Sequence, residues 1–296
     1  MKKVKFYGVD VSMFKLIASD LDGTMFEKGN VIPKTNLKAI EDINNSKINF
    51  TICTGKTYSL FKNICKDIET GYGIFGNGNQ IINLKTGEEI YKKTLKKDDI
   101  MFCIDKAKKL NLHIHMYTDK EIITEKLLYM DLRNFELTKN SEKVELEFKI
   151  VKDIKKYIEQ KQPEVLKLVI SSEKNLESLK DEFSKNLNLQ INLIKKIDKY
   201  KDEVIGKEYE YLDIMPRGIN KNEALKILEN YLHIDKSEVL AIGDNLNDIE
   251  MIKDSGVGIA VANAYDEVKK VANYTTSTTA QNGGFAEAVY KYIEFE

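Results

Sequence analysis

Long apolar runs, paired cysteines and a secretory leader pattern are all missing from this sequence. No stretch reaches the roughly 18 uncharged apolar residues that a membrane-spanning helix needs. The three cysteines, Cys53, Cys65 and Cys103, are far apart and form no CxxC pair, so neither a disulfide framework nor a zinc site is indicated. The first residues contain no apolar core of the secretory kind, since Asp10 and Lys15 interrupt it. These absences lead us to expect a cytoplasmic protein without a membrane partner.

An excess of either charge is missing as well. The chain has 46 lysine and arginine residues against 47 aspartate and glutamate residues, which gives a formal net charge of -1. We therefore expect no nucleic acid partner. Prolines are few, with 3 in 296 residues, whereas 42% of the residues are hydrophobic and 31% are charged. This composition is typical of a helix-rich globular protein, and the length favours about two domains.

The N-terminal third alternates strand-like and helix-like segments. KLIAS (15–19), INFTIC (48–53) and YGIF (72–75) have strand patterns, and helical patterns cover 33–45 and 58–68. This alternation predicts a parallel sheet with right-handed crossovers. Such sheets carry their chemistry at the carboxyl ends of the strands.

The C-terminal third resumes the same alternation. Strands are predicted at 209–215, 238–243 and 257–261, and helices at 221–232, from about 246, at 264–272 and at 284–293. The segment between the two thirds differs, because 112–125 reads as two adjacent strands and 164–194 as strand, helix and strand. We therefore expect an α/β fold with a doubly wound, Rossmann-like parallel-sheet core. Residues 1–85 and 208–296 would form this core, and 86–207 an inserted α+β cap domain.

Four short motifs carry polar residues near the ends of predicted strands. Three of them directly follow a strand, and the fourth begins the helix that comes after a strand. The four are Asp20 and Asp22 in DLDGT, Thr54 and Gly55 in CTGK, Lys221 in GINK, and Asp244 and Asp248 in GDNLND. Each is ambiguous alone, because Asp-Gly commonly forms a turn and GDNLND could cap a helix. Together they supply oxygen ligands for Mg²⁺ and donors for a phosphoryl group.

These four motifs, in this order, resemble those of the haloacid dehalogenase-type phosphohydrolases. About 30 residues separate Thr24 from Thr54, which leaves no room for a cap there, whereas well over 100 separate Thr54 from Lys221. A cap at the second position is similar to the Cof-type (subclass IIB) sugar-phosphate phosphatases. The phrases LIASDLDGT, GNGNQI, LDIMPRGINK and GDNLNDIEMI also look like that branch.

The resemblance implies the roles of the two aspartates in DLDGT. Asp20 would attack phosphorus and form an aspartyl-phosphate. Asp22 would protonate the leaving oxygen and later take a proton from water. Side chains two residues apart on an extended segment point the same way, which suits this pair of roles.

The remaining site residues follow from the same resemblance. Mg²⁺ would be held by Asp20, the backbone carbonyl of Asp22, and Asp244, while Asp248 would orient the metal shell or Lys221. Phosphoryl oxygens would be bound by a larger set: Thr54, the N–H groups of Leu21 and Gly55, the amide of Asn247, and Lys221, whose charge would stabilise the transition state.

Several positions leave alternatives open. The family usually has arginine, often followed by proline, where this chain has Lys56 and Thr57, and lysine lacks the planar fork of arginine. Met13 is either the natural initiator or preceded by a short edge segment. His113 and His115 share one face of a predicted strand and would bind a metal, line the substrate cleft or pack. The aromatic residues Tyr117, Tyr129 and Phe135 would stack on a sugar or pack in the core.

The predicted function is a Mg²⁺-dependent phosphomonoester hydrolase acting on small phosphorylated metabolites, above all sugar phosphates. A phosphomutase of the same fold and a non-catalytic phosphosugar-binding regulator are the alternatives. A P-type ion pump is excluded by the missing membrane spans. We expect a monomer or a weak homodimer.

Overall fold

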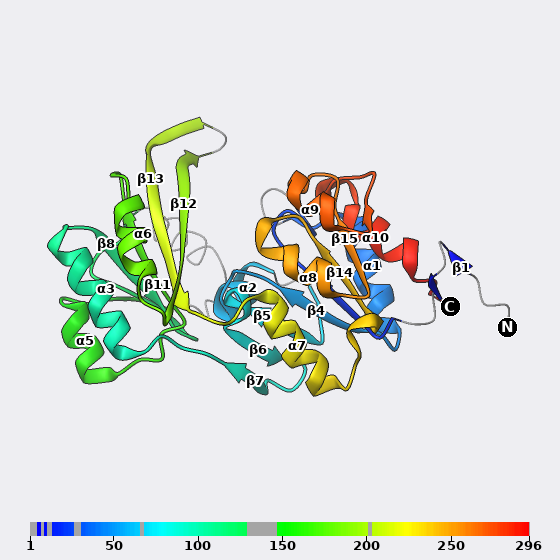
Figure 1. Ribbon diagram of the computed structural model, residues 1–296, viewed down its shortest axis with the longest axis horizontal. Helices are drawn as coiled ribbons and strands as arrows, with labels where there is room; N and C mark the ends of the chain where they lie inside the picture. The colour runs from blue at the N-terminus through cyan, green and yellow to red at the C-terminus, as the bar shows by residue number, and fades with distance from the viewer. Residues whose placement is uncertain are drawn as a thin grey trace. The chain divides into compact units, whose positions relative to one another are not determined.

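The computed structural model describes residues 5–6, 9–10, 14–26, 31–65, 68–128, 147–200 and 203–295 (Figure 1). The chain forms two compact units. Unit 1 consists of Met1–Lys56, Cys65–Lys92 and Ile219–Glu296, and unit 2 of Thr57–Ile64 and Lys93–Gly218. Met13, Tyr129 and Phe135 lie outside the described residues. Within the described ranges, no helix is long and apolar enough to cross a membrane.

Unit 1 contains an eight-stranded sheet in the order β16-β15-β14-β3-β4-β5-β6-β7. Six strands are parallel: β3 (Leu16–Ser19), β4 (Asn49–Cys53), β5 (Tyr72–Phe75), β14 (Val239–Gly243), β15 (Val257–Ala260) and β16 (Tyr274–Thr275). The central strands are buried along almost their whole length, as expected for a parallel sheet covered on both faces. The predicted α/β fold is confirmed in this unit.

Helices cover both faces of this sheet (Figure 1). They are α1 (Lys34–Asn45), α7 (Lys221–Leu232), α8 (Ile249–Asp254), α9 (Asp266–Val271) and α10 (Gly284–Tyr292). On one face, Leu225 and Leu228 of α7 and Met251 of α8 pack in the same core cluster as β3 and β14. On the other face, Phe285 of α10 packs against Phe50 of β4 with ring centroids 5.9 Å apart. The sheet is therefore doubly wound.

An antiparallel hairpin that the sequence did not reveal extends this sheet. Strands β6 (Gln80–Asn83) and β7 (Glu89–Lys92) pair antiparallel beside β5. The chain consequently leaves unit 1 at Lys92, later than the predicted domain boundary at residue 85. Strand β7 has only four residues, two of them charged, and is only partly buried, so it carries no clear apolar strand pattern. Near the N-terminus, β1 (Lys5–Phe6) and β2 (Val9–Asp10) form a separate two-stranded sheet.

Unit 2 contains a six-stranded sheet in the order β10-β9-β8-β11-β13-β12. The strands are β8 (His113–Tyr117), β9 (Glu121–Thr124), β10 (Glu147–Ile150), β11 (Lys167–Ser172), β12 (Leu189–Tyr200) and β13 (Glu203–Pro216). Helices α3 (Lys97–Lys109), α5 (Ile154–Lys161) and α6 (Glu177–Ser184) pack on one face through an apolar cluster centred on residues such as Ile170 and Phe183. The predicted strands within 112–125 and 164–194 are confirmed.

One predicted strand belongs to the other sheet. We expected 209–215 in the sheet of the core, but these residues form part of β13, which pairs with β11 and β12 in unit 2. Leu212 and Ile214 are buried in the cluster beneath the helices, whereas Tyr211 lies in a different cluster on the opposite face. Such alternation is typical of an antiparallel strand, not of a buried parallel one. The chain therefore returns to unit 1 only at Ile219.

The short helix α2 (Tyr58–Ile64) groups with unit 2 although unit 1 segments flank it in sequence. Its Leu60 packs against a cluster on the sheet face opposite α3, α5 and α6. The buried members of that cluster are Tyr117, Ile122, Val169, Tyr209 and Tyr211. Unit 2 is therefore built from two separate stretches of chain.

Candidate active site

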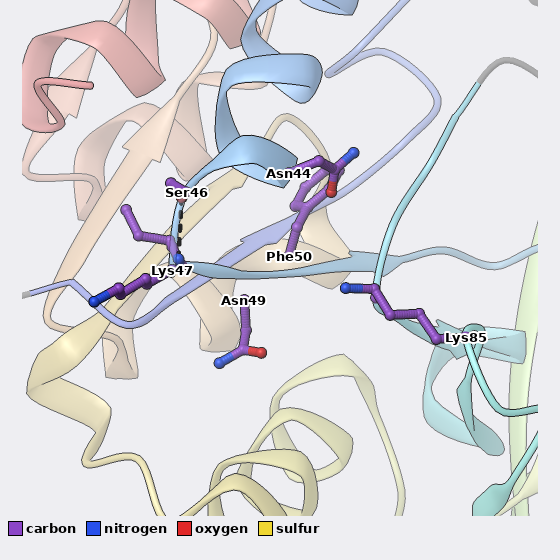
Figure 2. A pocket seen from close by; sticks show the side chains of 8 residues that line it. Asn44, Ser46, Lys47, Asn49, Phe50 and Lys85 are labelled. Carbon is purple, nitrogen blue, oxygen red and sulfur yellow. Dashed lines mark hydrogen bonds between the residues drawn. The ribbon is translucent and has the colours of Figure 1, made fainter. Parts of the chain in front are cut away.

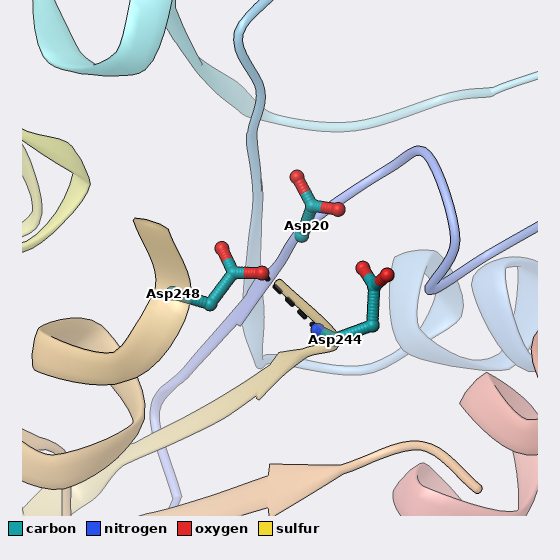
Figure 3. Close-up of side chains that lie close together, drawn as sticks. All are labelled: Asp20, Asp244 and Asp248. Carbon is teal, nitrogen blue, oxygen red and sulfur yellow. Dashed lines mark hydrogen bonds between the residues drawn. The ribbon is translucent and has the colours of Figure 1, made fainter. Parts of the chain in front are cut away.

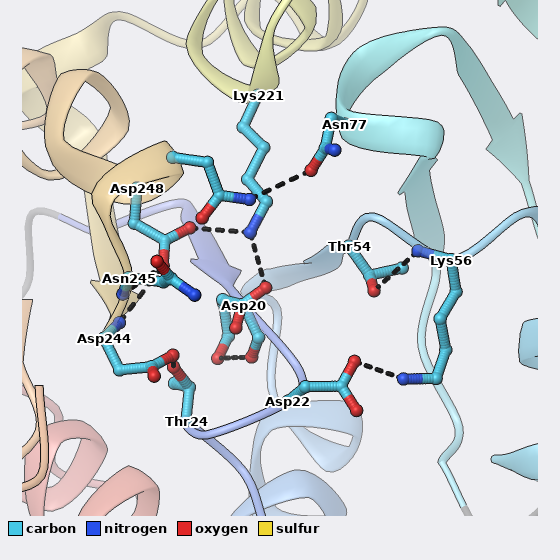
Figure 4. Close-up of polar contacts among 12 residues, drawn as sticks. Asp20, Asp22, Thr24, Thr54, Lys56, Asn77, Lys221, Asp244, Asn245 and Asp248 are labelled. Carbon is cyan, nitrogen blue, oxygen red and sulfur yellow. Dashed lines mark hydrogen bonds and ion pairs between the residues drawn. The ribbon is translucent and has the colours of Figure 1, made fainter. Parts of the chain in front are cut away.

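Loops at the carboxyl ends of β3, β4 and β14 and the first residue of α7 meet at one edge of the unit 1 sheet (Figure 4). Asp20 directly follows β3, and its backbone N–H donates to the carbonyl of Ile242 at 2.9 Å. The Lys221 Nζ donates to Asp20 Oδ1 at 2.5 Å and to Asp248 Oδ1 at 2.7 Å. All three side chains are at least nine-tenths buried. A lysine thus joins the first and last motifs directly.

Helix α7 positions this lysine through its N-cap. The Asn220 side chain accepts the backbone N–H of Glu223 at 2.8 Å, so the helix begins at Lys221. Lys221 is 1% exposed, which is unusual for a lysine and is compatible with its two carboxylate partners. Lys221 follows β13 of unit 2, so it does not reach the site from a strand of the unit 1 sheet, as we had expected.

The turn after β14 is built around Asp248. Its Oδ2 accepts the backbone N–H groups of Asp244 at 3.1 Å and Asn245 at 3.0 Å, so this carboxylate closes a capping box (Figure 4). A Cβ on Gly243 would lie 2.6 Å from the Cβ of Asp248, which leaves room only for glycine. With Oδ1 on Lys221, both oxygens of Asp248 are engaged. This residue therefore holds the loop and the lysine in place.

A second glycine permits close approach of the first and last motifs. Gly23 has φ +88°, and a Cβ there would lie 2.3 Å from Asp244 Oδ2. The next residue, Thr24, donates its hydroxyl to Asp244 Oδ1 at 2.8 Å. The Asp-Gly turn in DLDGT therefore brings Thr24 within hydrogen-bonding distance of Asp244 in GDNLND.

Asp20, Asp244 and Asp248 bring carboxylate oxygens within 4.8 Å of one another (Figure 3). Burial raises the pKa of Asp20 well above its usual range, and the charges of Asp248 and Asp244 raise it further against the opposing effect of Lys221. Burial, together with the charge of Asp248, raises the pKa of Asp244 to about 6. Burial alone would lower the pKa of Lys221, but its two carboxylate partners raise it, so the lysine keeps its proton.

This cluster fits a divalent cation. Lys221 pairs with two of these three buried carboxylates, so the ionised cluster carries excess negative charge that a cation would offset. Carboxylate oxygens are the ligands that Mg²⁺ prefers. Because Asp248 already uses both oxygens on protein donors, Asp20 and Asp244 are the side chains that could hold the metal.

Asp22 differs from Asp20 although only one residue separates them. Its side chain is 52% exposed and forms an ion pair with Lys56, which is 17% exposed. The Lys56 Nζ also lies 6.0 Å from the centre of the Phe26 ring. The lysine that replaces the usual arginine of the family thus contacts the second aspartate of DLDGT.

The structure brings the other predicted phosphoryl-binding residues to the same edge. Thr54 is fully buried after β4, and its hydroxyl accepts the Lys56 N–H at 3.2 Å. Leu21 is fully buried, directly after Asp20. Asn247 donates its side-chain amide to Asn77 Oδ1 at 3.0 Å. All predicted site residues of the four motifs therefore lie in unit 1.

Three residues at this edge were given no site role by the sequence. Thr24 donates a hydrogen bond to Asp244, Lys56 forms an ion pair with Asp22, and Asn77 accepts a hydrogen bond from Asn247. Asn77 lies in GNGN, directly after the predicted strand YGIF, so its place at a strand's carboxyl end was a usable signal. The pairing of side chains across loops carries no sequence signal.

The two histidines of the predicted cap segment lie in unit 2. His113 and His115 of β8 point to the same sheet face with ring centroids 5.7 Å apart, and both are buried. Among the described residues, the group of three or more carboxylate, imidazole or thiolate side chains close enough to hold a metal consists of Asp20, Asp244 and Asp248 of unit 1 and includes neither histidine. The metal-pair interpretation is thus without support, while the alternative of packing fits their burial.

A hollow of about 180 Å³ lies elsewhere in unit 1, near the amino end of β4 (Figure 2). Its lining includes Asn44, Lys47, Asn49 and Lys85. Thr54 and Gly55, two of the predicted phosphoryl-binding residues, follow the opposite, carboxyl end of β4. This hollow is therefore not part of the candidate active site.

The described fold is a doubly wound sheet with a cluster of carboxylates, a lysine and a threonine at its carboxyl edge. The family model described as haloacid dehalogenase-like hydrolase matches residues 17–289, so the chain belongs to this family. The resemblance found in the sequence is thereby confirmed.

Relatives of known name agree with this assignment. The chain is 26% identical over 286 residues to the putative phosphatase YxeH of Bacillus subtilis, covering 95% of this chain and 99% of the relative. It is 26% identical over 280 residues to the 5-amino-6-(5-phospho-D-ribitylamino)uracil phosphatase YcsE of the same species, covering 94% and 96%. A crystal structure of a haloacid dehalogenase-like hydrolase from Bacteroides thetaiotaomicron matches with TM-score 0.79 and 27% identity, covering 94% and 99%. The chain is an enzyme of the phosphatase type.

Proposed function

We propose that this enzyme is a Mg²⁺-dependent phosphomonoester hydrolase that acts on small phosphorylated metabolites, in particular sugar phosphates. The observation that carries the proposal is the buried contact of Lys221 with Asp20 and Asp248, beside Asp244. A nucleophile, a fixed positive charge and a candidate metal site occur within one cluster, which suits phosphoryl transfer.

In the first half of the reaction, Asp20 forms a bond from its carboxylate oxygen to phosphorus as the bond to the leaving oxygen breaks. Asp22 gives its proton to that leaving oxygen. Its half-exposed position suits this role, because a proton carrier must reach the leaving group and then exchange with water. Lys56 can pair with Asp22 once that proton has been given, and so holds the carboxylate that acts as the base in the second half.

In the second half, Asp22 takes a proton from a water molecule that attacks the phosphorus of the aspartyl-phosphate. The phosphorus–oxygen bond to Asp20 breaks, and inorganic phosphate leaves. Splitting the displacement into two steps allows one carboxylate to act as acid and then as base.

The phosphoryl oxygens would be bound by donors that the fold holds in place. Lys221 supplies charge, and Thr54 supplies its hydroxyl. Backbone N–H groups of Leu21 and Gly55 and the amide of Asn247 complete the proposed set. Mg²⁺ held by Asp20, the Asp22 carbonyl and Asp244 would keep the nucleophile ionised and offset phosphoryl charge.

The substrate class rests on two supports. Unit 2 is proposed to act as the cap that selects the leaving group, as an inserted domain of this position does in the resembled branch. The relative YcsE is named for a phosphorylated ribityl compound, which is a sugar-alcohol phosphate. Small polyhydroxylated phosphates are therefore the first substrates to test.

The test is a screen of the purified full chain against sugar phosphates, nucleotides and pyridoxal phosphate, with release of inorganic phosphate as the readout. We expect turnover that a chelator abolishes and added Mg²⁺ restores. Isomerised sugar phosphate with little free phosphate would instead identify a phosphomutase. Binding of sugar phosphates without turnover would identify a regulator, and activity indifferent to chelator would refute the metal requirement.

A further inference from the structure

The loop after β5 contains a residue in an unusual backbone conformation. Asn77, inside the short 3-10 turn η2 (Gly76–Gly78), has φ 56° and ψ 30°. Residues other than glycine rarely adopt this left-handed conformation, although asparagine tolerates it better than most. Such conformations persist where the surroundings hold them, and they are frequent at functional sites.

Backbone contacts tie this loop to the loop after β4. The Asn77 N–H donates to the carbonyl of Thr54 at 3.0 Å, and the Gly76 N–H donates to the carbonyl of Lys56 at 2.8 Å. On its other side, a Cβ on Gly78 would lie 2.4 Å from the carbonyl oxygen of Asn220. The loop therefore lies between Thr54–Lys56 and the N-cap of α7.

The side chain of Asn77 contacts two proposed phosphoryl-binding groups from different loops. Its Oδ1 accepts a hydrogen bond from the side-chain amide of Asn247 at 3.0 Å. A Cβ on Gly55 would lie 3.2 Å from the same Oδ1, so the carboxamide packs directly over this glycine. One N–H of the Asn247 amide is engaged by Asn77, which fixes the amide plane and hence the direction of the second N–H.

We propose that Asn77 is a positioning residue that aligns the phosphoryl-binding amides of Gly55 and Asn247. This inference rests on the proposed function and adds to it a residue that acts through others. The left-handed backbone places the carboxamide between the two loops, and the hydrogen bond to Asn247 sets the orientation of an otherwise exposed side chain.

The test uses Asn77→Gly, because glycine keeps the left-handed backbone without strain and removes only the carboxamide. We expect kcat/KM to fall about 5–10-fold, the range of one lost hydrogen bond, and equally for aryl and sugar phosphates. The rise in Tm that inorganic phosphate produces in the wild type should also shrink. A purely structural role would lower Tm without phosphate and leave this phosphate-dependent shift unchanged.

A double-mutant cycle with Asn247→Ala shows whether Asn77 acts through Asn247. We expect Asn77→Gly/Asn247→Ala to lose no more than about twofold beyond Asn247→Ala alone. Asn111→Gly is the matched control, because Asn111 also has positive φ, at 52°, but lies at the end of α3 in unit 2. It should behave as the wild type does.

The inference would be overturned if Asn77→Gly had the same kcat/KM and the same phosphate-dependent rise in Tm as the wild type. It would also be overturned if the fold-losses in kcat/KM of the two single variants multiplied fully in the double variant. If Asn77→Gly does not fold, Asn247→Ala removes the same hydrogen bond from its exposed end, and an unchanged phosphate response there refutes the role. A wild type that hydrolyses no phosphomonoester refutes the proposed function instead, and the phosphate-dependent Tm then still tests Asn77.

Discussion

Unit 1 and unit 2 bury polar side chains in different ways. In unit 1, Asp20, Lys221 and Asp248 are joined by hydrogen bonds into one network at the strand ends. In unit 2, Lys167 contacts Asp213 at 3.2 Å on one sheet face. Within the described residues, the other oxygen of Asp213 and the hydroxyl of Ser171 have no hydrogen-bond partner. The comparison shows that the buried polar side chains at the strand ends of unit 1 hydrogen-bond to one another, whereas, in the part of the chain that the structure describes, those on this sheet face of unit 2 leave polar atoms unpaired.

The largest expected effect comes from the nucleophile. Asp20→Asn should lower hydrolysis of an aryl phosphate at least about 10³-fold, because the amide cannot form the phosphoryl bond, while the fold stays intact. The measurement is steady-state phosphate release, with circular dichroism as a check on folding. Asp99→Asn in α3 is the matched control, since Asp99 is also buried and accepts a hydrogen bond from Asn186. Near-native turnover in Asp20→Asn would show that the nucleophile is misassigned.

The next largest effect compares the buried Lys221 of unit 1 with Lys167 of unit 2, whose side chain is 12% exposed. Lys221→Met leaves two buried carboxylates without their cation and should cost about 3–5 kcal/mol of stability. Lys167→Met loses one ion pair and a contact 4.9 Å from the Tyr117 ring centre, which we expect to cost about 1–2 kcal/mol. Hydrogen exchange with chelator present, resolved to peptides of each unit, measures both. Equal losses in the two variants would remove the distinction between the units.

A cavity-creating substitution in the core beneath the helices of unit 2 should lower the stability of this unit without lowering the rate of hydrolysis. Ile170 is fully buried in the cluster beneath α3, α5 and α6, so Ile170→Ala should cost about 2–5 kcal/mol. Exchange protection should fall in peptides of unit 2, while turnover of an aryl phosphate continues at temperatures where unit 2 remains folded. Equal loss of protection in the β3 and β14 peptides would mean that the two units unfold as one.

The smallest effect concerns a buried acid of unit 1 outside the network. Burial, together with the charge of Asp254, raises the pKa of Glu229 in α7 to about 7 from 4.5. Between these two values the folded state holds a proton that the unfolded state releases, so wild-type stability falls as the pH rises. Glu229→Gln should therefore stabilise by about 1–2 kcal/mol at pH 8 and change little near pH 4. Thermal unfolding at both pH values measures it, and a stabilisation that is the same at both would contradict the assignment.

The sequence predicted what depends on local pattern and on the rule for parallel sheets. Continuous apolar strands alternating with helices predicted the order of unit 1, and the carboxyl-end rule predicted that Asp20, Thr54 and Asp244 would lie together. Strand membership was harder to predict, because 209–215 reads as a strand in either sheet and its partners are distant in sequence. The contacts of Asn77 and Lys56 depend on loop geometry, which the sequence pattern does not encode.

The grouping of α2 with unit 2 bears on whether the inserted domain is exchangeable between relatives. A graft limited to 93–218 would leave behind Leu60, which packs on the cluster containing Tyr117 and Val169. The transplanted sheet would then pack against an α2 helix whose residues belong to a different sheet. An exchange that keeps this contact must therefore also transfer 57–64, the segment that begins directly after Lys56. The loop that bears Thr54 and Gly55 thus limits where the domain can be exchanged.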